Sequence, residues 1–246
     1  MTKPYLKFAS ALLSIAISSA AVASEQQDLM AKKEITQTLS LTPDLENGKK
    51  VFSTCALCHS PEGWGTEDGS TPEIAGQLTP VIIKQIIDIR QGNRDNPTMI
   101  PFTSHMVMSK QDMVDVATYL ERLKKSPSNL TGPGDNLELG EKVYVKECAE
   151  CHGANGEGKA EKFYPKIHGQ NYNYLLRQMM WIKNGKRKNA NKNMIKQIKR
   201  FTEEDITAVI DYVSRLRPDP SKVAKEGWNN PDFPKDFKHS PKYENK

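Results

Sequence analysis

The feature that most constrains this chain is a five-residue pattern that occurs twice. CALCH at Cys55–His59 and CAECH at Cys148–His152 together contain all four cysteines. An offset of 93 residues superimposes the two patterns and two longer downstream segments: IIKQIIDIRQG from Ile82 on LLRQMMWIKNG from Leu175, and SKQDMVDVATYLERL from Ser109 on TEEDITAVIDYVSRL from Thr202. Upstream, NGKKVF and LGEKVY correspond with a shift of one residue. The chain is therefore a duplication of one small domain, because two copies are too few for a solenoid.

Each copy has the periodicity of helices. Apolar residues recur at steps of three and four in both downstream segments: Met113, Val116, Ala117, Leu120 and Leu123 in the first, and Ile206, Val209, Ile210, Val213 and Leu216 in the second. Ser109 and Thr202 stand at the N-cap position of these helices. Further helices are expected over residues 81–90 and 174–183, each closed by a glycine. No alternating pattern competes, so the sequence predicts an all-α fold.

The cysteine pattern itself indicates a cofactor. Residues i, i+3 and i+4 share one face of a helical turn, so two thiols three residues apart can bond to the two vinyl groups of one haem. The next residue, a histidine, then lies under the iron, and C-x-x-C-H is the pattern of c-type haem attachment. A zinc site would need more ligands at its own spacing, and a thioredoxin-like pair would need a βαβ context. The sequence predicts two covalent haem c groups, on the pairs Cys55/Cys58 and Cys148/Cys151, with His59 and His152 on the irons.

Composition along the chain predicts six segments. Residues 1–23 have a positive start, an apolar stretch and a small-x-small site at Ala21-Val22-Ala23, as in a signal peptide cleaved near Ala23. A retained membrane anchor is the alternative, but it needs about 20 predominantly apolar residues. We therefore expect a periplasmic protein without an integral membrane segment after cleavage. The remaining segments are an N-terminal extension (24–44), domain 1 (45–125), a linker (126–136), domain 2 (137–217) and a polar C-terminal tail (218–246), with Trp228 and Phe233 as possible anchors.

Each half resembles a class I cytochrome c domain, and the tandem resembles the dihaem cytochromes c of the c-four type. The resemblance rests on the haem motifs and on YPKIHGQNYNYLLRQM from Tyr164, which is similar to a proline–glycine–glutamine stretch and the helix that follows it in that family. It implies two tandem domains, each wrapped around one covalently attached haem. It also implies that the carbonyls of Pro72 and Pro165 accept hydrogen bonds from the proximal histidines.

Methionine opposite histidine would give six-coordinate irons of relatively high potential. Met194 lies eight residues before Thr202, where the family places its ligand. The same offset leads to Pro101 in the first half, so we expect Met99, which like Met194 is followed by isoleucine. His105 is the competing ligand and would lower the potential; another residue or an open site are further alternatives. His168 replaces a small residue of the family pattern and is expected to be exposed or to bond a haem propionate.

Charge differs between the two halves. Residues 45–130 hold nine Lys and Arg against ten Asp and Glu, whereas residues 131–217 hold 16 against 11. The segment Lys183–Arg200 has eight basic residues and no acid, and it brackets Met194. It is either a solvated loop or a surface that steers an acidic redox protein to the second haem. Nucleic acid is a poor partner for an exported haem protein.

These features favour an electron carrier that exchanges electrons with redox proteins through two haems. No nucleophile–base set is visible, so we assign no catalytic residue, and two six-coordinate irons would leave no site for a substrate. The alternative is a dihaem oxidoreductase, or the electron-accepting subunit of one, for instance in sulfur-compound oxidation or peroxide reduction. The irregular placement of Met99 is the only hint of it.

Overall fold

The computed structural model describes residues 26–237, and the predicted signal peptide (1–23) lies outside the described residues. The first half contains α2 (Leu45–His59), α3 (Thr79–Arg90), α4 (Ile100–Thr103) and α5 (Lys110–Arg122). The second half contains α6 (Leu137–Glu147), α7 (Ala149–His152), η1 (Ala160–Lys162), α8 (Tyr172–Lys183), α9 (Lys192–Lys199), α10 (Glu203–Arg215) and η2 (Pro220–Lys222). Residues 26–39 form one more helix. Within the described residues extended pairing is limited to two isolated bridges, which confirms the all-α prediction.

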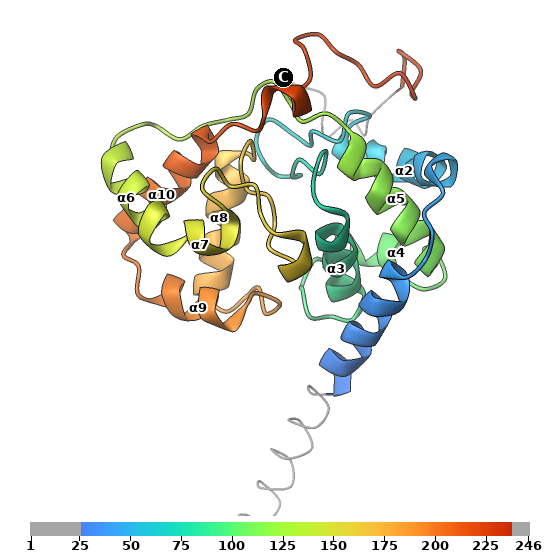
Figure 1. The fold of residues 1–246 in the computed structure, drawn as a ribbon, viewed down its shortest axis with the longest axis horizontal. Helices are drawn as coiled ribbons and strands as arrows, with labels where there is room; N and C mark the ends of the chain where they lie inside the picture. The colour runs from blue at the N-terminus through green and yellow to red at the C-terminus, as the bar shows by residue number, and fades with distance from the viewer. Residues whose placement is uncertain (1–25, 238–246) are drawn as a thin grey trace, which may run out of the picture.

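The two halves lie side by side, each around its own core (Figure 1). In each half the first helix crosses the last: α2 packs on α5, and α6 packs on α10. Both crossings need a glycine. A Cβ atom on Gly48 would lie 2.3 Å from the carbonyl oxygen of Asp115, and one on Gly140 would lie 2.2 Å from that of Ala208. The duplication seen in the sequence is therefore also a duplication of the helix packing.

The last helix of each half begins at the predicted residue. The Ser109 hydroxyl accepts from the Asp112 amide and the Asp112 carboxylate accepts from the Ser109 amide, which is a capping box. Thr202 and Asp205 form the same box at the start of α10. The predicted N-caps are confirmed in both copies.

The one-residue shift between the upstream segments has a structural cause. α2 is one continuous helix through Cys55 to His59, whereas the corresponding segment of the second half is interrupted at Cys148, which separates α6 from α7. The interruption takes up the extra residue between Gly140 and the haem motif. The motif therefore keeps its place relative to the last helix in both halves.

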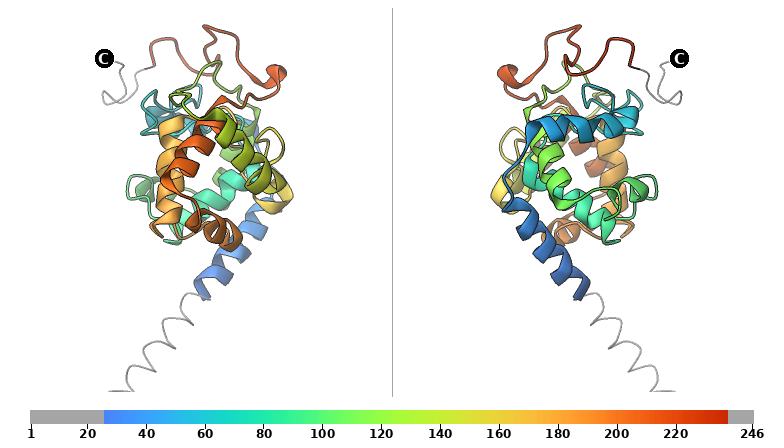
Figure 2. Two further views of the ribbon diagram at one scale, coloured as in Figure 1. Left: turned by 90° about the vertical axis from the view of Figure 1, so that its left-hand side faces the viewer. Right: turned by 90° about the vertical axis from the view of Figure 1, so that its right-hand side faces the viewer.

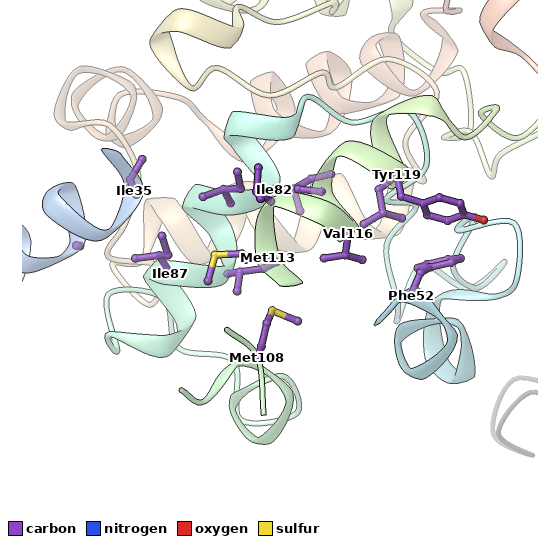
Figure 3. Packing of buried hydrophobic residues seen from close by; sticks show 14 of the residues in the cluster. Ile35, Phe52, Ile82, Ile87, Met108, Met113, Val116 and Tyr119 are labelled. Atoms are coloured by element: carbon purple, nitrogen blue, oxygen red, sulfur yellow. The ribbon is translucent and has the colours of Figure 1, made fainter. Parts of the chain in front are cut away.

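The N-terminal extension contributes to the first core. Along the helix over residues 26–39, Ala31 and Ile35 are buried in the same cluster as Phe52 and Ile87. Figure 3 shows Ile35 at one edge of this cluster and Met108 reaching into it from the loop before α5. The spacing of Ala31 and Ile35 is the i, i+4 spacing of one helix face.

The C-terminal tail leaves the second half and packs on the first (Figures 1 and 2). Val223 pairs with Lys125 in a parallel bridge. The ring of Trp228 lies 5.9 Å from that of Trp64, and the ring of Phe233 meets that of Phe52 edge-on at 5.6 Å. The possible anchors of the tail are thus both in contact with the first half.

Polar contacts hold the same tail segment. The Asn230 amide donates to the carbonyl of Pro61 at 2.7 Å, and the Tyr119 hydroxyl donates to Asp232 at 2.9 Å. Asp232 also forms an ion pair with Lys49 at 2.7 Å.

Among the described helices, none combines the length and the apolar character that crossing a bilayer requires.

Candidate haem sites

The first haem motif occupies the last turn of α2. Cys55 and Cys58 are half-buried, and His59 is 7 % exposed. Nδ1 of His59 lies 3.0 Å from the carbonyl oxygen of Pro72. A carbonyl can only accept, so Nδ1 carries the proton and the lone pair of Nε2 is left for a metal.

The second motif repeats this geometry on α7. Nδ1 of His152 lies 3.1 Å from the carbonyl oxygen of Pro165, and the ring is 8 % exposed. In both copies a backbone amide caps the motif, since Gly65 donates to the carbonyl of His59 at 2.9 Å and Gly158 donates to that of His152 at 2.8 Å. The two loops therefore hold the two imidazoles in matching orientations.

Burial sets the protonation of these groups. It lowers the pKa of His59 to about 4, against the opposing effect of the Pro72 carbonyl. Burial likewise lowers the pKa of His152, opposed by Pro165. Both imidazoles are neutral near pH 7, the form that binds a metal through Nε2. The four thiols are not joined in disulfides, so both motifs present the donor set that one haem c requires.

The predicted sixth ligands lie in the loops before the last helices. We call residues 91–108 the first methionine loop and residues 184–201 the second. Met99 is the N-cap of the short helix α4, whereas Met194 lies within the longer α9. Both side chains are half-buried. The two loops thus differ in local path, as the misalignment of Met99 with Met194 implies.

The competing residues of the first methionine loop have other environments. The side chain of His105 is 65 % exposed, and its Nδ1 lies 3.2 Å from the guanidinium of Arg90. Met108 is buried in the core with Met113 (Figure 3). A ligand role for His105 stays open as a prediction, although its side chain lies at the surface.

His168 differs from one of its expectations. It is 6 % exposed, and its Nδ1 lies 2.9 Å from the carbonyl oxygen of Asn155. Burial, with help from the charge of Lys125, lowers its pKa to about 4. The expectation of an exposed side chain is wrong, because the loop after the second haem motif folds over the ring.

A reciprocal exchange of side chains links the two haem loops. Gln77 bonds the backbone amide and carbonyl of Lys166, at 2.9 Å each. Gln170, its partner at the offset of 93, bonds the backbone amide and carbonyl of Glu73, at 3.2 and 2.9 Å. Glu73 and Lys166 directly follow the two loop prolines. Each domain therefore supports the loop that orients the proximal histidine of the other.

Two arginines meet at the same domain boundary. Arg187 donates to the amide oxygens of Gln178 and Gln85, at 2.9 and 3.3 Å, and Arg94 donates to the same two oxygens. These acceptors are neutral. Burial and the charge of Arg94 lower the pKa of Arg187 to about 10. The charge of Asp88 opposes this effect, but among the described residues neither guanidinium forms an ion pair with a carboxylate.

These boundary residues were missed in the sequence, although a signal was present. Arg94 and Arg187 coincide at the offset of 93, and so do Gln85 and Gln178. A polar residue retained in both copies of a duplication, outside the haem motif, is a candidate for a shared role at the boundary.

The basic segment Lys183–Arg200 is largely at the surface. Its exposed members are Lys186, Lys188, Lys192, Lys196, Lys199 and Arg200. Lys186 stacks over the ring of Trp181 at 4.3 Å, and Arg200 lies 3.3 Å from Glu147. Arg187 is turned into the domain boundary and Lys183 donates to the carbonyl of Phe201. These two residues are only half-buried, but their head groups are engaged within the protein, so we do not count them with the exposed members.

Comparisons with known proteins agree with this geometry. The model of the family "Cytochrome c" matches residues 45–124 and 137–217. The chain is 28 % identical over 197 residues to cytochrome c4 of Azotobacter vinelandii, which covers 74 % of this chain and 93 % of the relative. It is 27 % identical over 197 residues to the thiosulfate dehydrogenase electron acceptor of Stutzerimonas stutzeri, covering 72 % and 90 %. The crystal structure of reduced recombinant cytochrome c4 from Pseudomonas stutzeri superimposes with a TM-score of 0.63 at 25 % identity, covering 72 % of this chain and all of that chain.

Proposed function

The chain belongs to the cytochrome c family, and from this premise we propose that it is a periplasmic electron carrier with two His/Met-ligated irons. The chain is a dihaem cytochrome that carries two covalent haem c groups, one in each repeat. The periplasmic location rests on the signal-peptide pattern of residues 1–23. We also propose the domain limits 45–125 and 137–217, joined by the linker 126–136.

The proposed attachment residues are those of the two motifs. Cys55 and Cys58 hold the first haem, Cys148 and Cys151 hold the second, and His59 and His152 are the proximal ligands. The observation that carries this assignment is the matched hydrogen bond from each imidazole to a loop proline, at 3.0 Å to Pro72 and 3.1 Å to Pro165. Such a bond fixes the tautomer and the plane of a ligating imidazole.

The proposed sixth ligands are Met99 and Met194. Each haem supplies a one-electron couple when bound, and a thioether opposite an imidazole favours a relatively high potential. The protein contributes orientation and burial. Because Gln77 and Gln170 brace the loops across the boundary, little rearrangement of the proximal side is expected when the charge of a site changes.

The arginines of the boundary would neutralise haem carboxylates. Buried cations persist where they are paired, and the guanidinium fork suits carboxylates well. The hydrogen-bond acceptors of Arg94 and Arg187 are neutral amides and a tyrosine hydroxyl. We propose that these two residues face the propionates, which are the anionic groups that two haems would bring into the protein.

The exposed part of the basic segment is the proposed docking surface for an acidic redox protein. It comprises Lys186, Lys188, Lys192, Lys196, Lys199 and Arg200, and it flanks Met194. Complementary charge raises encounter rates by about 10- to 1,000-fold and is screened by salt. Residues 95–108 of the first domain, by contrast, contain no lysine or arginine.

The docking proposal is tested by stopped-flow reduction with an acidic redox protein. Replacing Lys188, Lys192 and Lys196 by Glu is expected to slow reduction about tenfold or more at low salt and to flatten the salt dependence. Arg187 is left intact because it lies at the domain boundary. The matched control is the triple variant Lys32→Glu, Lys33→Glu and Lys50→Glu, because these three lysines are exposed and lie outside the docking surface. An unchanged rate and salt slope in the docking-surface variant would remove the docking surface.

The carrier function is tested on the purified, oxidised protein. We expect a mass that includes two haems, uptake of two electrons per chain in a reductive titration, and a near-infrared sulfur-to-iron band from both irons. A high-spin signal from one haem together with turnover of peroxide or thiosulfate would replace the carrier by an enzyme.

One comparison favours a second candidate. The likeness to a thiosulfate dehydrogenase electron acceptor supports a role as the electron-accepting subunit of a dehydrogenase. This candidate predicts a stable complex with a catalytic partner and rapid reduction when thiosulfate is added to that complex. The simple carrier predicts a transient encounter instead.

A further inference from the structure

Arg90, the last residue of α3, is buried at the point where three segments meet. Its guanidinium donates to the carbonyl oxygen of Met108 at 2.6 Å and to that of Thr103. It also forms an ion pair with Glu34, and the side chains of Arg90 and Glu34 are 3 % and 7 % exposed. One side chain thus joins α3, the first methionine loop and the N-terminal helix.

The bonds of Arg90 lead to the backbone of Met99. Met99 is the N-cap of α4, and the amide of Thr103 donates to its carbonyl at 3.2 Å. Thr103 then offers its own carbonyl to Arg90. The short helix between Met99 and Thr103 is therefore held at its far end by the guanidinium.

Glu34 comes from outside both family-model segments. It lies on the helix over residues 26–39, and its second oxygen accepts from the Gln91 amide at 3.0 Å. Neighbouring residues of that helix are buried against the first core, Thr38 completely. The carboxylate is therefore fixed by its own helix and presented to Arg90 from a part of the chain that the repeat lacks.

The second domain provides an internal comparison. Lys183 stands at the offset position of Arg90 and donates to the carbonyl of Phe201, which corresponds to Met108. An ammonium is a compact point charge, whereas a guanidinium offers donors in a rigid fork. Both domains thus have a hydrogen bond from the end of the middle helix to the methionine loop. In the first domain the guanidinium of Arg90 makes a second bond to that loop and pairs with the buried carboxylate of Glu34.

We propose that Glu34 and Arg90 form a clamp by which the N-terminal helix positions the first methionine loop and keeps Met99 on the iron of haem 1. The proposal rests on the assignment of Met99 as the sixth ligand. A buried arginine without its carboxylate is strongly disfavoured, so loss of the Glu34 charge draws Arg90 toward water and releases Thr103 and Met108. Glu34 and Arg90 are positioning residues, because neither touches the haem ligands.

The test measures how readily added imidazole displaces methionine from each iron in the oxidised holoprotein. Proton NMR resolves the strongly shifted methyl signal of each axial methionine, and Met99→Ala and Met194→Ala assign the two signals. An added ligand binds only the fraction of molecules whose loop is open, so its apparent affinity rises with that fraction. In Glu34→Gln we expect the imidazole affinity of haem 1 to rise about tenfold, equivalent to about 1.4 kcal/mol, with haem 2 unchanged.

Two further variants complete the test. Ile35→Val alters a buried apolar residue of the same helix and should leave both haems unchanged; Thr38 is not used, because its hydroxyl donates to the carbonyl of Glu34. Arg90→Lys, which imitates domain 2, should give a smaller rise at haem 1, and it replaces Glu34→Gln if that variant does not fold.

The outcomes separate the clamp from the ligand assignment. If both methionine signals are present in the unmodified protein and Glu34→Gln leaves imidazole binding unchanged, or shifts both haems equally, the clamp is wrong. If the Met99 signal is missing in the unmodified protein, the ligand assignment fails first, and the clamp as stated fails with it.

Discussion

The two domains share the same helix packing but differ in the segments that pack against it. Domain 1 is flanked by chain from outside the repeat, since the helix over residues 26–39 packs beside α3 and the tail packs across α2 and α5. The methionine loops of both domains have exposed side chains, but the exposed residues of the second loop are mainly basic and those of the first include several apolar ones. Met106 and Val107, 98 % and 60 % exposed, stand where domain 2 has Lys199 and Arg200. The duplication thus provided two domains with the same helix packing and the same haem motif. The added N-terminal and C-terminal segments distinguish domain 1, and the basic residues distinguish domain 2.

The sharpest test of this comparison replaces each proposed sulfur ligand in turn. Met99→Ala should abolish the sulfur-to-iron band of haem 1 and leave that of haem 2, and Met194→Ala should do the opposite. Each variant then keeps about half of the band. Near-infrared spectra of the oxidised proteins measure this directly.

His105→Ala is the control for this pair, because the exposed imidazole competes for the same iron in the ligand assignment. Its spectrum should match that of the unmodified protein. A loss of low-spin character in His105→Ala, with no change in Met99→Ala, would transfer the ligand role to the histidine and make the two irons chemically unlike.

Removing the tail should weaken only one of the domains. Deleting residues 224–246 takes away Trp228 and Phe233 with their ring contacts to Trp64 and Phe52. Two partly buried aromatic anchors contribute roughly 3 kcal/mol. Hydrogen exchange should accelerate in α2 and α5, while α6 and α10 keep their protection.

Lys235→Ala is the control for the deletion, since this exposed residue belongs to the same segment. It should change exchange in neither domain. Equal loss of protection in both domains would mean that the tail stabilises the boundary between them and does not act as a cover of domain 1.

The helix crossings should respond alike in both domains, in contrast to the tail. Gly48→Ala and Gly140→Ala each force a Cβ atom against a backbone carbonyl, at 2.3 and 2.2 Å. Overpacking of this kind costs about 1–3 kcal/mol, measured by denaturant unfolding. Ser53→Ala and Lys146→Ala, at exposed positions on α2 and α6, are the controls. A cost confined to one domain would show that the duplicated crossings are not equivalent.

The sequence predicted those parts of the molecule that depend on residues close together in the chain. Each capping box joins residues three apart. The helices, the haem motifs and the repeat were accessible for the same reason. The hydrogen bonds from His59 to Pro72 and from His152 to Pro165 were implied by the family resemblance, and both are observed. The ligand roles of Met99 and Met194 stay predictions.

The packing of the N-terminal helix and of the C-terminal tail on domain 1 could not be predicted from the sequence, because it depends on residues far apart in the chain. Glu34 meets Arg90 across 56 residues, and Asp232 meets Tyr119 across 113. Local composition marked the tail as polar and the extension as unassigned, since neither segment has enough apolar residues to indicate where it packs. His168 was misjudged for a similar reason: its acceptor is a backbone carbonyl, which leaves no trace in the sequence.

The boundary arginines allow the smallest and most selective test. Because oxidised iron carries one more positive charge than reduced iron, removing a nearby cation favours the oxidised form and lowers the reduction potential. For a separation of about 10 Å and an effective dielectric constant of about 20, the effect is on the order of 1 kcal/mol, or roughly 50 mV for a one-electron couple. Spectroelectrochemical titration of Arg94→Gln and Arg187→Gln measures it.

Both arginines are half-buried, so their charges are only partly screened by water and both variants are expected to lower a potential. Lys186→Gln removes a neighbouring charge that is exposed over Trp181 and should leave both potentials nearly unchanged. A rise in potential, or an equal shift from the exposed lysine, would exclude a propionate role for the arginine pair. If both arginines shift both potentials, the two haems share one electrostatic boundary despite the different covers of their domains.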